Sequence, residues 1–179
     1  QVSDALREAT TAGKRYGGLH AAAGKLGAGA GDHVRLALLG IVFKSAGLPE
    51  AYAHARFVMW RRHEGLLRAV EADLEAAGRS LAEELPHLYV SPRIAKALLK
   101  AYPGFAESET AARALLKAQF PQVADISNDQ LIAAITDALS MNGRFPLTLI
   151  VLDEVQQYIG SDTQKAYLVQ EVTETLCKH

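Results

Sequence analysis

The sequence predicts a mainly α-helical protein in which a helical bundle is joined to a partial α/β core. Apolar residues recur at helical spacing through most of the chain between residues 32 and 142. One unbroken aliphatic run, Leu147 to Leu152, departs from this spacing and has the length of a strand. The glycine- and alanine-rich N-terminal part leaves room for one or two further strands. We therefore expect three parts: a connecting segment at 1–31, a helical bundle at 32–143, and a strand with its following helix at 144–179.

The composition is that of a folded domain. The chain has 179 residues, of which 49% are hydrophobic, and a formal net charge of −1, so charge alone gives no argument for binding nucleic acid. The single cysteine, Cys177, excludes an internal disulfide and is consistent with a reducing compartment. The sequence has neither a transmembrane-length apolar stretch nor a signal-peptide pattern. We expect a cytoplasmic protein with no membrane partner.

The two ends of the sequence indicate a fragment. The chain starts at Gln1 rather than at methionine, and it ends at His179 while a helical pattern is still running. We therefore expect this chain to be an internal piece of a larger protein.

Capping residues and glycines set the expected helix boundaries. Asp32 is expected to cap a helix from His33 to about Ser45, and a long second helix is expected from Pro49 to about Ala77, with Gly65 as a bend. Shorter helices are then expected to begin at Ser91, at Ser108, at the capping box Ser127 to Gln130, and near Asp162.

The aliphatic run ends in two adjacent acids, Asp153 and Glu154. A run without period-2 alternation is typical of a strand that is buried on both faces of a parallel sheet. The acids then lie at the carboxyl end of that strand, where open α/β sheets bind their ligands. One strand cannot form a sheet, so its partner must come from residues 1–30, from a second molecule, or from sequence outside this chain. We expect the third.

The order of the two acids is typical of a Walker B element in a P-loop ATPase. Asp153 would hold the water shell of a Mg²⁺ ion at the phosphates of ATP, because Mg²⁺ needs few protein ligands. Glu154 points the other way along the strand and would act as general base toward the attacking water. The alternative is that an ordinary strand ends in two acids by coincidence.

The glycine-rich tract from Gly17 to Gly31 does not fit a Walker A loop. Five residues, instead of four, separate Gly18 from Gly24, and Leu26 stands where a serine or threonine should bind Mg²⁺. No hydrophobic strand precedes the tract. We expect it to be a flexible or closely packed connection.

Four arginines of the second helix, Arg56, Arg61, Arg62 and Arg68, form its expected polar face. Clustered arginines can contact the phosphates of DNA or of a nucleotide. A solvated helix face is the alternative for these residues. Phe57 and Trp60 are expected in the core rather than in a binding surface.

The stretch from Leu147 to Gly160 resembles the Walker B region of the large bacterial P-loop ATPases of BREX and phage growth limitation systems, the BrxC and PglY type. The resemblance is carried by Asp153 and Glu154 followed by Val-Gln-Gln-Tyr-Ile-Gly at 155–160. It implies a long helical segment between Walker A and Walker B, which is where residues 32–142 fall.

The resemblance implies a parent protein that hydrolyses ATP with Mg²⁺ in antiviral defence. Such a parent would work as an oligomer together with DNA and other defence proteins. The Walker A lysine and any sensor residue or arginine finger are missing from this sequence, so the fragment alone is expected to be inactive. Two alternatives stay open: a helical module that binds protein or DNA without nucleotide chemistry, and a degenerate ATPase that binds nucleotide only structurally.

Overall fold

The fold was determined as a computed structural model, which describes residues 2–27 and 33–178. The chain is mainly helical, as predicted, with a small parallel sheet. It forms two compact units, which we call the sheet unit (residues 1–50 and 124–179) and the helical unit (residues 51–123). Among the described residues, no helix combines the length and the apolar character needed to cross a membrane.

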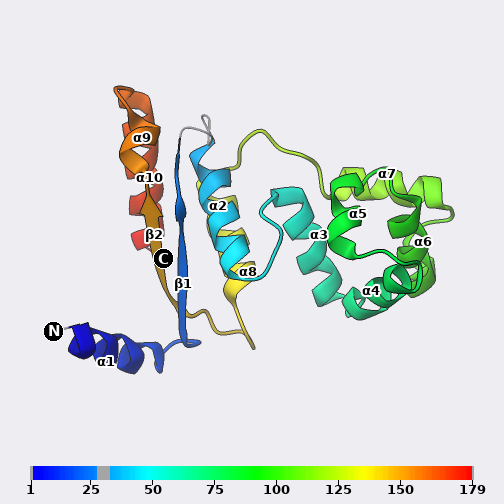
Figure 1. Cartoon of the computed structure of the whole chain (residues 1–179), viewed down its shortest axis with the longest axis horizontal. Coiled ribbons are helices and arrows are strands. Elements are labelled where there is room, and N and C mark those ends of the chain that lie inside the picture. Colours follow the sequence, from blue (N-terminus) through cyan, green and yellow to red (C-terminus); the bar gives the residue numbers. More distant parts are fainter. Residues whose placement is uncertain (1, 28–32, 179) are drawn as a thin grey trace. The chain divides into compact units, whose positions relative to one another are not determined.

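The sheet unit combines both ends of the chain (Figure 1). Its elements are α1 (Val2–Gly13), β1 (Leu19–Lys25), α2 (Val34–Ser45), α8 (Asn128–Leu139), β2 (Leu147–Asp153), α9 (Val155–Ile159) and α10 (Thr163–Cys177).

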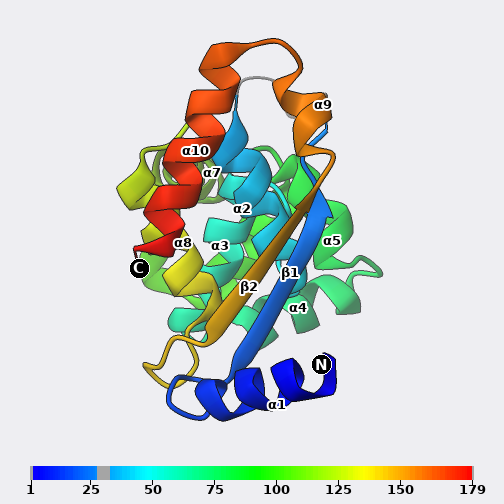
Figure 2. The same ribbon diagram turned by 90° about the vertical axis from the view of Figure 1, so that its left-hand side faces the viewer.

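The two strands form a parallel pair in which Leu19 lies opposite Leu147 and Lys25 lies opposite Asp153. Figure 2 shows β1 and β2 side by side along their whole length. The partner of the aliphatic strand therefore comes from residues 1–30, and our expectation that it lies outside the chain was wrong. The tract expected as a connection contains this strand, because pairing with β2 satisfies the backbone groups of a small-residue segment.

Helices cover one face of the sheet. Helix α2 packs against β1, and α8 and α10 both contact α2. The contact between α2 and β1 is close: a Cβ atom at Gly24 would lie 2.6 Å from the Cγ1 of Ile41. Ala22 is fully buried on this face.

The opposite face of the sheet is open. Along β2 the exposed and half-buried residues alternate, and Leu149 and Val151 keep 63% and 50% of their surface exposed. The expectation that this strand is buried on both faces was therefore wrong for the structure described here. The cause is that α2 packs on the other face of the sheet with α8 and α10 behind it, while α1 contacts β1 near its start, where Gly13 lies beside Leu19.

Helix caps in the sheet unit follow the sequence closely. Ser127 and Gln130 form the predicted capping box of α8, in which the Ser127 hydroxyl accepts from the Gln130 N–H and the Gln130 side chain accepts from the Ser127 N–H. Asp162 caps α10 by accepting from the N–H groups of Gln164 and Lys165. The expected cap of α2, Asp32, lies outside the described residues.

We expect Ser127→Ala to lower the free energy of unfolding by about 1 kcal/mol, because the first turn of α8 loses its side-chain acceptor. Denaturant titration followed by circular dichroism measures this change. Ser161→Ala is the matched control, since Ser161 is exposed and the cap of α10 is the neighbouring Asp162. Equal stability of both variants would contradict a stabilising role for the capping box.

The helical unit is built from short helices around an aromatic cluster. Its elements are α3 (Tyr52–His63), α4 (Leu67–Ala76), α5 (Leu81–Glu84), α6 (Pro92–Ala101), α7 (Glu109–Gln119) and two 3-10 turns, η2 (Leu85–His87) and η3 (Pro103–Phe105). Phe57 and Trp60 pack against Phe120, with ring centroids 5.6 Å apart in each case. The predicted core position is confirmed for Phe57, which is fully buried, whereas Trp60 is half-buried.

Two helices of this unit begin where predicted. Ser91 caps α6 and Ser108 caps α7, each through its hydroxyl. The long second helix, by contrast, is two helices, α3 and α4, separated at Gly65. Gly65 has a φ of +70°, which breaks the helix rather than bending it.

The unit boundaries differ from those expected from sequence. The helical unit ends at residues 51 and 123, whereas the predicted bundle extended from 32 to 143. The difference arises because α2 packs on β1 and α8 packs on α2, so both helices belong to the sheet unit.

Candidate functional site

The candidate site lies at the carboxyl end of the sheet. β1 ends at Lys25 and β2 ends at Asp153, and these two residues are register partners. Glu154 follows directly and precedes α9. The parallel pairing therefore brings one cation and two carboxylates to one edge, where ligands of open parallel sheets bind.

Lys25 and Glu154 form an ion pair. The Lys25 ammonium donates to the Glu154 carboxylate over 2.6 Å between Nζ and Oε1. This hydrogen bond and the charge of Glu154 raise the pKa of Lys25 above its usual value. The Lys25 side chain is 67% exposed and that of Glu154 is 28% exposed, so the pair is accessible to a competing ligand.

The backbone holds Glu154 in an unusual conformation. Its φ of 59° and ψ of 19° lie in the left-handed region, which non-glycine residues rarely adopt. The Asp153 carboxylate accepts from the Glu154 N–H at 2.8 Å and so supports this turn. Such conformations concentrate at functional sites.

The chain segment after β1 passes close to Glu154. Leu26 is buried and its N–H donates to the carbonyl of Asp153, so the strand pairing extends one residue beyond β1. A Cβ atom at Gly27 would lie 3.2 Å from the Glu154 Oε2. The remainder of the predicted glycine tract, residues 28–31, lies outside the described residues.

The donor set of this edge fits a hydrated Mg²⁺ ion. Mg²⁺ keeps several waters and is usually held by one or two carboxylates, and Asp153 is exposed at the strand tip. In the described part of the chain, no group of three or more histidine, cysteine, aspartate or glutamate side chains is arranged for a metal. Lys25 supplies a positive charge that could approach a phosphate oxygen.

The four arginines predicted to contact phosphate or DNA do not share one surface. They belong to the helical unit, where Arg62 and Arg68 are exposed and Arg56 is half-buried. Arg61 is fully buried, which corrects its predicted place on the polar face. It lies one turn after Phe57 on α3, and its guanidinium carbon is 4.5 Å from the centre of that ring.

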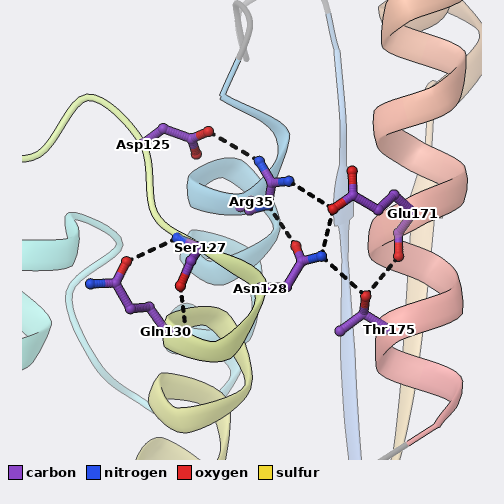
Figure 3. A network of polar contacts seen from close by, with 7 residues as sticks. All are labelled: Arg35, Asp125, Ser127, Asn128, Gln130, Glu171 and Thr175. Carbon is purple, nitrogen blue, oxygen red and sulfur yellow. Dashed lines mark hydrogen bonds and ion pairs between the residues drawn. The ribbon is translucent and has the colours of Figure 1, made fainter.

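A polar network around Arg35 joins three helices of the sheet unit (Figure 3). The Arg35 guanidinium of α2 donates to Asn128 at 2.7 Å, to Asp125 at 3.1 Å and to Glu171 at 3.2 Å. Asn128 also donates to Glu171 at 2.6 Å. The network fixes α2, α8 and α10 relative to one another behind the sheet.

Asp153 and Glu154 lie at the end of the aliphatic strand, as the sequence predicts, and their function stays a prediction. The ion pair of Lys25 and the network of Arg35 were not predicted. Lys25 entered only as part of a glycine tract that failed as a Walker A loop, because β1 was not recognised as a strand. Arg35 has polar partners about 90 to 136 positions away, which no local pattern reveals.

Comparisons with protein-family models, with curated proteins and with solved structures found no match for this chain.

Proposed function

We propose that this chain is part of an ATP-hydrolysing P-loop ATPase and contributes its Walker B strand. The observation that supports the proposal most is the parallel pairing of β1 with β2, which sets Asp153 and Glu154 beside the end of a neighbouring strand. A lone strand ending in two acids would be weak support. Two parallel strands joined through a helical crossover are the arrangement in which carboxyl-edge acids meet a bound nucleotide.

Asp153 and Glu154 have different roles in this proposal. Asp153 would hold Mg²⁺ through water, and the ion, when bound, would neutralise charge on the phosphates of ATP. Glu154 would orient the attacking water and accept its proton. The left-handed backbone of Glu154 turns its side chain toward β1 and Lys25, on the same edge as Asp153.

Lys25 controls the availability of the proposed base. While its ammonium holds the Glu154 carboxylate, one oxygen of that carboxylate is occupied. A phosphate that attracts Lys25 would free this oxygen for water. The proposal therefore includes Lys25 as a residue that positions Glu154.

The proposed biological setting comes from the resemblance of residues 147–160 alone. The parent would act in bacterial anti-phage defence, as an oligomer with DNA and other defence proteins as partners. It would carry a Walker A loop elsewhere, and this chain by itself would not hydrolyse ATP.

Glu154→Gln tests the proposal in the complete ATPase, which must carry a Walker A loop. The amide cannot accept a proton, so we expect ATP binding within about twofold of the unchanged protein and turnover lowered by about 100-fold or more. Equilibrium binding of a fluorescent ATP analogue and a phosphate-release assay measure the two quantities. Glu107→Gln, an exposed substitution in the helical unit, is the matched control. Full turnover by Glu154→Gln would refute the assignment of the base.

A further inference from the structure

The open face of the sheet is an apolar surface with a regular arrangement. Its residues alternate with those that face α2, and they come in register pairs across the two strands. Its large aliphatic side chains include Leu19, Leu149 and Val151, which keep 50%, 63% and 50% of their surface exposed. The pairs of this open face, from one end to the other, are Leu19 with Leu147, Ala21 with Leu149, Ala23 with Val151, and Lys25 with Asp153.

This face has the chemistry of a buried surface. β2 is aliphatic at nearly every position, including those that point away from α2. Parallel strands of this composition are normally covered on both faces. A sheet of two strands also needs packing on its faces to be stable, so leaving this one in water is costly.

We propose that a second copy of this chain covers the open face, related by a two-fold axis that runs parallel to the strands. Such an axis turns the two sheets face to face and places β1 of one copy over β2 of the other. The two copies then use the same residues, as a two-fold interface requires. Face-to-face sheets with nearly aligned strands are a common packing, about 10 Å apart.

The sizes of the side chains fit this arrangement. Under the two-fold axis, the small residues Ala21 and Ala23 of one copy lie opposite the partner's Leu149 and the partner's Val151. At these two levels a large aliphatic side chain meets a small one, which favours interdigitation of the two faces, while at the start of the strands Leu19 meets the partner's Leu147. An axis perpendicular to the strands would instead bring the apolar end of one sheet over the charged end of the other.

The charges fit the same axis. Lys25 of one copy lies opposite the partner's Asp153, and the symmetry repeats this pair once more. The Lys25 ammonium has three donors, so it can contact the partner's Asp153 while it keeps its bond to Glu154. Opposite charges therefore meet at one end of the interface, whereas any arrangement that reversed the strands would separate them.

This inference does not rest on the proposed ATPase function. It uses the register and exposure of the sheet face, whereas the ATPase proposal uses the acids as ligands and as a base. A failure of nucleotide binding would leave the dimer untouched, and a monomeric chain would leave the ATPase proposal untouched.

Sedimentation equilibrium of the 179-residue chain tests the dimer directly. We expect a concentration-dependent species at twice the 19.3 kDa of the single chain. Val151→Asp should raise the dissociation constant by about 100-fold, because it places a charge at the centre of the apolar face. Val90→Asp is the matched control: Val90 is exposed in the helical unit, so we expect it to leave dimerisation unchanged. Circular dichroism of each variant checks that the fold is kept.

A charge-exchange experiment tests the direction of the axis. Lys25→Glu and Asp153→Lys should each weaken the dimer, because each places two like-charged pairs in the interface. Mixing the two variants should restore dimers, since the mixed pair has opposite charges at both positions. A chain that stays monomeric over the whole concentration range overturns the proposal. A dimer that survives Val151→Asp, or a mixture that fails to recover while both variants are folded, overturns it as well.

Discussion

Arg61→Met is expected to stabilise the helical unit by about 1–4 kcal/mol. The Arg61 side chain is fully buried, and none of its three guanidinium nitrogen atoms has a hydrogen-bond partner among the described residues. The guanidinium lies over the Phe57 ring, a cation–π interaction worth about 0.5–2 kcal/mol. Methionine has a similar shape, keeps the packing on Phe57 and removes the cost of burying an unpaired charge.

The pKa of Arg61 gives the same prediction a pH dependence. Burial lowers the pKa of this guanidinium well below its usual value, to about 10, and the negative charge of Glu71 offsets only part of the effect. The unfolded chain therefore binds more protons than the folded chain between about pH 10 and the usual pKa of an arginine. The cost of the buried charge is present in full below pH 10 and decreases as the pH rises through this window. The gain from Arg61→Met should decrease in the same window.

Trp60 fluorescence measures the effect, because the single tryptophan of the chain belongs to the aromatic cluster of the helical unit. Denaturant titrations at pH 8 and above pH 10 give the two free energies of unfolding. Arg68→Met is the matched control, since Arg68 is an exposed arginine of the same unit. Loss of stability in Arg61→Met would mean that the guanidinium has polar partners in solution that outweigh its burial.

The opposite result is expected at Arg35. Arg35→Met should destabilise the sheet unit by about 2–3 kcal/mol, because it removes three charge-assisted hydrogen bonds at once. The Arg35 side chain is only 12% exposed, so water cannot fully replace these contacts. Asn128 and Glu171 would keep their hydrogen bond to each other but lose the positively charged guanidinium that contacts both.

Hydrogen exchange of α8 and α10 measures this change, since both helices contact the network. The matched control is Lys44→Met on the same helix, whose ion pair with Glu50 is highly exposed and should contribute less than about 1 kcal/mol. A double-mutant cycle of Arg35→Met with Asn128→Ala gives the coupling energy. If the changes in the free energy of unfolding caused by the two substitutions are additive, Arg35 does not stabilise the unit through its contact with Asn128.

Local signals predicted the helix starts well. Ser91, Ser108, Ser127 and Asp162 all cap the helices expected from sequence. A cap depends on one side chain and the three residues after it, so a short window of sequence contains all the information. The Asp153 and Glu154 positions were predictable for the same reason, because they directly follow the aliphatic strand.

Long-range packing was not predictable in this way. β1 has the sequence Leu-His-Ala-Ala-Ala-Gly-Lys, which has little intrinsic strand preference, and it is a strand because it pairs with β2. The open face of β2 contradicts its own composition, which predicts burial on both sides. Arg61 was assigned to a polar face, although its spacing of four residues from Phe57 also allows the buried side that the structure assigns to it.

The order of the chain has a consequence for biosynthesis. β1 leaves the ribosome well before its partner, because Leu19 and Leu147 lie about 130 residues apart in the sequence. At a synthesis rate of about 5–20 residues per second, β2 follows β1 after about 6–26 s. A strand of alanine, glycine and histidine is a poor template for aggregation during that delay. The aggregation-prone aliphatic strand, β2, is made after β1 and finds β1 already available. The unequal composition of the two strands thus protects the nascent chain.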